Sequence, residues 1–275
     1  MREIKEQGST LIDWLKRNSI FIVFLALCPI LVLGGCGRED GSWERMQQAG
    51  TLRIGVDPTF PPFALADGEN VAGIDIERGR ALAAELMLDP QFVYFGYDGL
   101  YDALTTGQVD VLISALVLMP ERTKDVAYTN PYFDAGLILV VPGDTLNIQG
   151  MEDLNNRIVS VELGALGHVE ALEWQRKMNG LTVQTHSDSE EALKAVVDGR
   201  ADAALVDSIS GRLYLRDLPA GENMLTILPE PVYSEPYALA VRIDERELLE
   251  RLNGALAEIV RDGTLDDIIA DHLGP

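Results

Sequence analysis

Short apolar runs alternate with longer amphipathic stretches through most of the chain. The apolar runs at 51–57, 91–97 and 110–119 are bounded by turn-forming residues, which predicts buried strands. The stretches 73–88 and 98–109 carry apolar residues at helical spacing, so each predicts a helix. Predicted strands and helices therefore alternate along the first half of the sequence.

The second half of the chain repeats this pattern. Its predicted strands are 136–142, 157–164, 182–187, 202–208 and 237–243. Its predicted helices are 165–178, 188–201, 245–263 and 264–273. Alternating strands and helices are typical of the α/β class with largely parallel sheets, so we expect two similar α/β halves.

Two of the predicted helices start with a candidate capping residue. Asp75 lies near the start of the 73–88 helix, where its carboxylate is expected to cap the first turn. Ser187 or Asp188 precedes Glu190 and Glu191, an arrangement typical of a capping box.

The halves are not separated by a long linker, which predicts that the chain crosses between them in extended segments. The candidate crossings are 137–144 and 236–242. We therefore expect one lobe to contain residues 49–140 and 235–275, and the other lobe to contain residues 141–234.

The N-terminal 35 residues have a different character. A polar stretch ends in Lys16 and Arg17, and an almost continuous apolar run of signal-peptide length follows it. The run ends in "LGGC", which resembles a bacterial lipobox and implies lipidation of Cys36 after cleavage of residues 1–35. The alternative is an uncleaved anchor helix, and both alternatives place the rest of the chain outside the cytoplasmic membrane.

Composition adds two constraints. The two cysteines are Cys28 in the apolar run and Cys36 at its end, so the domain beyond the polar tether 36–48 has no disulfide. The net charge of -22 excludes a nucleic-acid partner, because phosphates would be repelled. A solvated acidic surface explains this charge best.

A lone arginine follows the apolar run 110–119. The run leads through Pro120 and Glu121 into Arg122, which has no obvious partner inside the core. One alternative pairs Arg122 at the surface with Glu121 or Asp125. The other gives it a partner from outside the chain.

Several stretches, in order, resemble the bacterial family-3 extracellular solute-binding proteins, the receptors of polar amino acid ABC importers. They are "LRIGVDPTFPPFALAD", "GIDIERGRALAAELM", "YDGLYDALTTGQVDVLISALVLMPERTKDVAYTNPYF", "GRADAALVDS" and "EPYALAVR" with the helical segment after it. The resemblance covers about residues 49–273. It implies a two-lobed, hinged clamp in which each lobe is an α/β sheet and a small solute lies in the cleft.

The resemblance assigns roles to charged residues. Arg122 matches the arginine that binds the α-carboxylate of the ligand, for which a planar guanidinium is suited. Asp207 matches the aspartate that receives the α-ammonium, although it is also placed to cap a helix after its strand. Asp57 matches a position whose carboxylate meets a cationic side chain in some members.

Aromatic residues at two positions match the walls of the family's pocket. Phe60 is the best match to an aromatic that covers the ligand, and Tyr97 stands where many members have a pocket tryptophan. For Phe60 and its neighbour Phe63, packing in the core is the alternative role.

The sequence also departs from the family pattern. Ala115, Val117 and Met119 replace small or hydroxyl-bearing residues, and Ala165 replaces a threonine or serine at the start of a helix in the second lobe. We therefore expect the ligand to be either a less polar amino acid or a compound other than a standard α-amino acid.

Two alternatives to import remain open from the sequence. Some proteins with this fold are dehydratases, and His168 is the one histidine near an expected cleft, with Glu162 as an acidic candidate. A sensory ligand-binding module is the other alternative. We expect no catalytic residues, no cofactor and no metal, a monomer bound to its membrane by lipid, and an ABC permease as partner.

Overall fold

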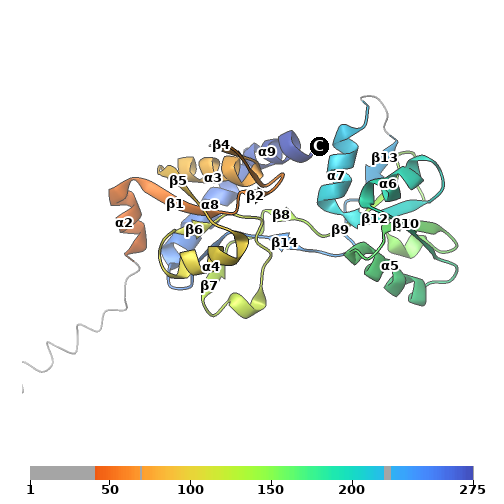
Figure 1. Ribbon diagram of the computed structural model, residues 1–275, viewed down its shortest axis with the longest axis horizontal. Helices are drawn as coiled ribbons and strands as arrows, with labels where there is room; N and C mark the ends of the chain where they lie inside the picture. Colours follow the sequence, from red (N-terminus) through yellow and green to blue (C-terminus); the bar gives the residue numbers. More distant parts are fainter. Residues whose placement is uncertain (1–40, 69, 220–223, 275) are drawn as a thin grey trace, which may run out of the picture. The chain divides into compact units, whose positions relative to one another are not determined.

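The computed structural model describes residues 41–68, 70–219 and 224–274 (Figure 1). The predicted signal segment 1–35, the lipidation site Cys36 and the first part of the tether lie outside the described residues. Within the described ranges, no helix is both long and apolar enough to cross a membrane.

The first sheet has five strands in the order β5-β1-β6-β15-β7. Their bounds are β1 (Thr51–Val56), β5 (Asp89–Tyr94), β6 (Val111–Leu112), β7 (Val126–Tyr128) and β15 (Ala240–Arg242). Strand β1 pairs in parallel with both β5 and β6, and β15 is antiparallel to β6 and β7. Four strands therefore run in one direction and β15 runs against them.

The second sheet has the order β11-β10-β12-β9-β13, which repeats the first. Its strands are β9 (Leu137–Pro142), β10 (Ile158–Glu162), β11 (Thr182–His186), β12 (Ala203–Asp207) and β13 (Leu225–Ile227). Here β9 is antiparallel to both of its neighbours, and the other four strands run in one direction. The predicted α/β class with two similar, mostly parallel sheets is confirmed.

Two short strands run between the sheets along the chain. They are β8 (Phe133–Asp134) and β14 (Pro236–Tyr237), which form an antiparallel pair (Figure 1). Strand β9 already belongs to the second sheet, so the expected lobe boundary at residues 140 and 141 lies inside a strand of that sheet. A separate small sheet contains β2 (Thr59–Phe60), β3 (Ala64–Asp67) and β4 (Asn70–Ala72).

Helices cover both faces of each sheet, because successive strand residues point to opposite sides. The helices are α2 (Ser42–Ala49), α3 (Ile74–Glu85), α4 (Tyr97–Thr105), α5 (Leu166–Lys177), α6 (Ser189–Val197), α7 (Ser208–Asp217), α8 (Arg246–Arg261) and α9 (Thr264–Leu273). In β6, Val111 joins a core cluster with α3, α8 and α9, whereas Leu112 joins the cluster under α4. In β12, Leu205 packs toward α5 and Val206 toward α6.

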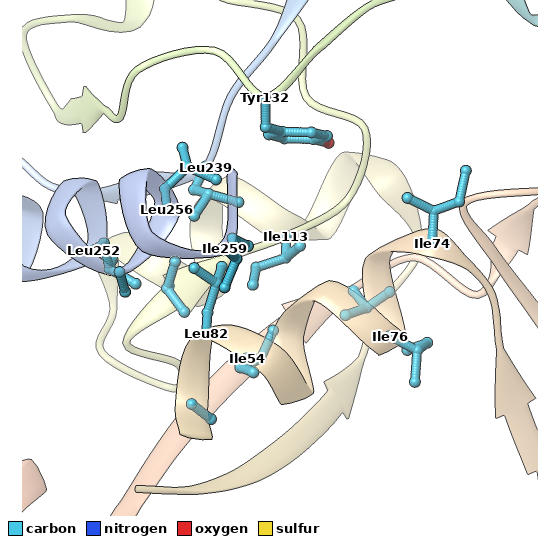
Figure 2. Close-up of a cluster of buried hydrophobic side chains, with 14 of the residues drawn as sticks. Ile54, Ile74, Ile76, Leu82, Ile113, Tyr132, Leu239, Leu252, Leu256 and Ile259 are labelled. Carbon is cyan, nitrogen blue, oxygen red and sulfur yellow. The ribbon is translucent and has the colours of Figure 1, made fainter. Parts of the chain in front are cut away.

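The larger core cluster shows how the sequence pattern becomes packing. Figure 2 shows Ile54 of β1 and Leu82 of α3 facing Leu252, Leu256 and other residues of α8. The α8 residues Leu248, Leu252, Leu256 and Ile259 recur at three- to four-residue spacing, so they form one apolar stripe toward the sheet.

Three expectations about local structure differ from the fold. Asp75 does not cap α3, because the N-cap is Gly73 and the Asp75 side chain is buried. The predicted strand 110–119 has ladder pairing only at Val111–Leu112 and an isolated bridge at Val117. The third difference is helix α7, which the sequence predicted only through the capping alternative for Asp207 and without bounds. Asp188 does cap α6, since its side chain accepts a hydrogen bond from the Glu191 amide.

Candidate ligand site

A cavity of about 340 Å³ opens at the carboxyl ends of β1 and β6. Its lining residues are Asp57, Thr59, Phe60, Tyr97, Ser114, Ala115, Val117 and Tyr237. Parallel strands end at the same edge of a sheet, which is where open α/β folds bind ligands. Five of the predicted site residues thus line one cavity: Asp57, Phe60, Tyr97, Ala115 and Val117.

Asp57 is the charged residue of this cavity and is held by its local sequence. It directly follows β1, and its backbone N–H donates to Ser114 Oγ at 2.9 Å. Its Oδ1 accepts hydrogen bonds from the Thr59 amide at 3.0 Å and from Thr59 Oγ1 at 2.7 Å. The Asp-Pro-Thr sequence is typical of such an Asx turn. Asp57 is only 6% exposed, so its carboxylate meets little bulk water.

The aromatic residues of the cavity divide into exposed and buried ones. Phe60 and Tyr97 are 44% and 42% exposed, as expected for rings that a ligand would cover on binding. Phe60 stacks on Phe63 at 5.7 Å between ring centroids, and Phe63 is fully buried against Phe133 and Tyr237. The core-packing alternative therefore holds for Phe63, while Phe60 lies at the cavity.

The backbone at Ala115 has a left-handed conformation. Its φ is +46°, an uncommon value for a residue with a Cβ atom. The turn ends the ladder pairing of β6 after two residues and leads the chain into the cavity wall at Val117. Small side chains suit this position, because a larger one would add strain and fill the cavity.

Asp207 and Ala165 line a second cavity, of about 120 Å³, in the second sheet's part of the chain. Its walls come from the ends of β10 and β12, the start of α5 and the turn after β8. Asp207 caps α7, since its Oδ1 accepts from the Ser210 amide at 2.8 Å. The capping alternative is thus confirmed, and because a carboxylate has two oxygens, capping still leaves acceptor capacity for a ligand.

The start of α5 depends on a close approach to β12. A Cβ atom on Gly167 would lie 2.6 Å from the Leu205 carbonyl oxygen, so only glycine fits there without a shift. Ala165 is the N-cap of α5 and provides no side-chain cap. Beside this helix start, Glu162 Oε2 accepts a hydrogen bond from Ser189 Oγ at 2.8 Å. The second cavity is therefore lined by three acidic residues, Glu162, Asp207 and Glu235.

Arg122 lines neither cavity. It ends the short 3₁₀ helix η1 (Pro120–Arg122), is exposed, and lies with its guanidinium carbon 4.3 Å from the centre of the Tyr101 ring. Its charge still reaches the first cavity: burial raises the pKa of Tyr97, and Arg122 opposes that shift. Arg122 is thus beside the first cavity and in contact with an aromatic ring.

Sequence reasoning missed Tyr237 and Thr59 as cavity residues. Tyr237 comes from β14, more than one hundred residues after the other lining residues, and the β14–β8 pairing brings it there. No local pattern marks it. Thr59 had a signal, because a threonine two residues after an aspartate is placed to bond its carboxylate.

A third cavity, of about 490 Å³, is lined by residues of α6 and α7 and adjoins the second one through Glu162 and Ser189. None of the predicted ligand residues lines it. His168, the candidate catalytic histidine, lines none of the three, and its Nδ1 accepts a hydrogen bond from the Gly164 amide at 3.2 Å.

The fold and the cavity at the strand ends are those of a solute-binding protein, and comparisons with known proteins agree. The family model of bacterial extracellular solute-binding proteins, family 3, matches residues 52–275. This chain belongs to that family.

Individual relatives have names that describe amino acid binding. The chain is 30% identical over 240 residues to the L-cystine-binding protein TcyJ of Escherichia coli K12, covering 86% of this chain and 87% of TcyJ. A solved ancestral cationic amino acid solute-binding protein is 32% identical with a TM-score of 0.61, covering 84% of this chain and 99% of that one. The L-cystine solute receptor of Neisseria gonorrhoeae, in its unliganded open conformation, is 25% identical with a TM-score of 0.73, covering 84% and 96%.

Proposed function

We propose that this chain is the extracytoplasmic substrate-binding component of an ABC importer and that its substrate is an amino acid. The observation that carries the proposal is the 340 Å³ cavity lined by five of the predicted ligand residues. A buried carboxylate, two exposed rings and a small apolar floor are typical of a small-molecule site. Family membership and the names of the relatives support the same function.

Each predicted residue has a role in this proposal. Phe60 and Tyr97 flank the side chain of the substrate, and Ala115 and Val117 form the floor beneath it. Asp207, together with the Ala165 end of α5, binds the α-ammonium and the backbone side of the substrate in the closed clamp. Arg122 binds the α-carboxylate through two parallel hydrogen bonds. Binding then couples the two lobes, because the α-carboxylate binds Arg122 of one lobe and the α-ammonium binds Asp207 of the other.

The buried carboxylate of Asp57 points to a substrate with a cationic side chain. A charge that meets little water is stabilised most by an opposite charge, and the Thr59 bonds occupy only one of its oxygens. A cationic substrate differs from the less polar or non-standard ligand that Ala115 and Val117 led us to expect from the sequence. L-arginine and L-lysine are therefore the first substrates to test, and the disulfide-linked diamino acid L-cystine is the third.

We infer that the protein binds without catalysis. His168 accepts a hydrogen bond from its own turn and lines none of the cavities. Glu162 is held by Ser189 and lies beside Asp207, which suits recognition of an ammonium group. The substrate should be recovered unchanged after incubation with the protein, as mass spectrometry would show.

We also propose a lipid anchor on Cys36, which the "LGGC" sequence supports, and a monomer that meets a permease at the membrane. Two acyl chains or more hold a protein stably, whereas one binds marginally. The variant Cys36→Ser should not be labelled by fatty acid. If another peptidase cleaves its signal, the variant should appear in the soluble extracytoplasmic fraction. If no peptidase cleaves it, the variant should keep residues 1–35. Fatty-acid labelling of Cys36→Ser equal to wild type would contradict lipidation there.

The central test is a thermal-shift screen of the purified domain against the standard amino acids and L-cystine. At about 100 times its dissociation constant a ligand adds roughly 2.7 kcal/mol to the free energy of unfolding. For a domain of this size that raises Tm by about 5–10 °C. Arg122→Ala should remove most of the shift. No shift with any amino acid, or an equal shift in Arg122→Ala, would overturn the proposal.

A further inference from the structure

Arg122 is in contact with an aromatic ring that the family resemblance did not assign to the site. Its guanidinium carbon lies 4.3 Å from the centre of the Tyr101 ring, within the range of about 6 Å for cation–π attraction. Tyr101 is 5% exposed, so the ring presents its face to Arg122 from the protein interior. The long, exposed arginine side chain thus has a fixed surface to lie on.

The Tyr101 ring is itself fixed from behind. Its hydroxyl and that of Tyr128 are 2.9 Å apart, in a hydrogen bond that joins α4 to β7. Tyr101 also belongs to the core cluster of Leu104, Val126 and Ala240. Burial raises the pKa of the Tyr101 hydroxyl, so this phenol stays neutral at physiological pH. The ring can therefore act as a rigid platform.

This platform is tied to the wall of the first cavity. Tyr97 lines the cavity and Tyr101 lies four residues later on α4, so the two side chains are on the same face of the helix. Arg122 acts electrostatically on both tyrosines, opposing the effect of burial on the pKa of each. The guanidinium is therefore close to the cavity without filling it.

We propose that Tyr101 is a positioning residue for Arg122: its ring holds the guanidinium beside the cavity, and Tyr128 fixes the ring. This rests on the proposed role of Arg122 in binding a carboxylate. A guanidinium that stacks on a ring can still bind a carboxylate, because its N–H groups point outward in its own plane. Holding the side chain before binding reduces the rotamer entropy lost on binding.

A purely structural role for Tyr101 is the competing explanation, because the ring also fills the core. Three variants distinguish the positioning role from the structural role. Tyr101→Phe keeps the ring and loses the hydroxyl, and Tyr128→Phe, the matched control, loses the same hydrogen bond from the other side. Tyr101→Leu keeps apolar volume and loses the platform.

The first experiment needs no ligand. In protein with ¹⁵N-labelled arginine, the Arg122 Nε–H resonance, assigned by its absence in Arg122→Lys, is expected to be shifted upfield by the ring. The shift should persist in Tyr101→Phe and vanish in Tyr101→Leu. An unshifted resonance in the wild type would overturn the stacking and with it the proposal, whatever the protein binds.

The second experiment measures binding by calorimetry with L-arginine and its α-carboxamide, L-argininamide, or with another amino acid and its amide if the screen selects one. Tyr101→Leu should weaken binding of the amino acid by about 3- to 10-fold, the range of a cation–π contact. Tyr101→Leu should change the dissociation constant of the amide by less than about 2-fold. In an Arg122→Ala background it should not weaken binding of the amino acid any further. Binding stoichiometry gives the folded fraction of each variant.

The two hypotheses fail in different ways. Equal weakening of amino acid and amide by Tyr101→Leu, or losses that add in the double variant, would overturn positioning by Tyr101 and leave the proposed function intact. If no amino acid binds the wild type, the carboxylate role of Arg122 fails, and the positioning role fails with it even where the resonance is shifted.

Discussion

The guanidinium carbon of Arg78 lies 3.2 Å from the centre of the Tyr132 ring, and the same fully buried guanidinium pairs with Asp75 one turn earlier on α3. Tyr132 directly precedes β8, the first strand that runs toward the second sheet. Burial raises the pKa of Asp75, and the Ala115 backbone in the wall of the first cavity is among the groups that oppose this rise. A buried ion pair thus lies under the first cavity and at the start of one crossing.

We expect Arg78→Met to lower the free energy of unfolding by about 3–5 kcal/mol, because it leaves Asp75 buried without a partner. The double variant Asp75→Asn/Arg78→Met removes both charges and should recover most of that loss. Urea denaturation of the three proteins provides the measurement. A single variant as stable as the wild type would show that the pair contributes nothing.

The pH dependence of these two variants isolates Asp75. Burial raises the pKa of Asp75, and Arg78 opposes that rise. In Arg78→Met the folded-state pKa therefore moves further above the unfolded value of about 3.9. An acid with a raised folded pKa destabilises progressively as pH increases from the unfolded to the folded pKa. The stability difference between Arg78→Met and the double variant should be large at pH 7 and shrink toward pH 4. A constant difference would contradict this sign.

Asp57→Asn tests whether the first cavity selects cationic side chains. Removing the charge while keeping the shape should weaken L-arginine binding by roughly 10- to 100-fold and leave uncharged amino acids within a few-fold. Ser114→Ala is the matched control, since it loses the bond from the Asp57 amide and keeps the carboxylate. Calorimetry that found equal losses for charged and uncharged amino acids in Asp57→Asn would argue against selection by charge.

Asp207→Asn separates two roles of one side chain. Asparagine caps helices about as well as aspartate, so Tm without ligand should stay within a few degrees of the wild type. The charge for the α-ammonium is lost, so binding of the amino acid should weaken by 10-fold or more. Differential scanning fluorimetry with and without ligand checks both. If the ligand raised the Tm of Asp207→Asn as much as that of the wild type, Asp207 would cap α7 without binding the ligand.

Gly167→Ala should destabilise the second sheet by about 1–3 kcal/mol, because the new Cβ meets the Leu205 carbonyl oxygen. Gly254 lies exposed in α8 with open space around its Cα, so Gly254→Ala should instead stabilise by about 0.5–1 kcal/mol. Guanidinium denaturation of the pair compares the same chemical change in two environments. A neutral Gly167→Ala would mean that α5 moves away from β12 easily.

The family segments in the sequence predict much of the candidate site. Asp57, Phe60 and Tyr97 each stand next to the end of a predicted strand or at the start of a predicted helix. Their meeting at one pocket was predicted from the family resemblance, and the rule that parallel strands end at one edge of a sheet gives the physical reason. The place of Arg122 does not follow from this rule, because Arg122 belongs to a short 3₁₀ helix beyond the strand and its guanidinium lies over the Tyr101 ring.

Periodicity and turn residues in the sequence by itself determined the alternating elements, the repeated half and the amphipathic face of α8. The tertiary structure decided which backbone N–H and C=O groups are hydrogen-bonded in a sheet. The run 110–119 is mostly apolar, yet it pairs as a ladder at only two residues, and beyond the left-handed Ala115 it meets Tyr237 through an isolated bridge at Val117. Asp75, Tyr237 and Arg78 likewise take their roles from segments far along the chain. Burial and pairing are properties of packed neighbours, and no local pattern contains them.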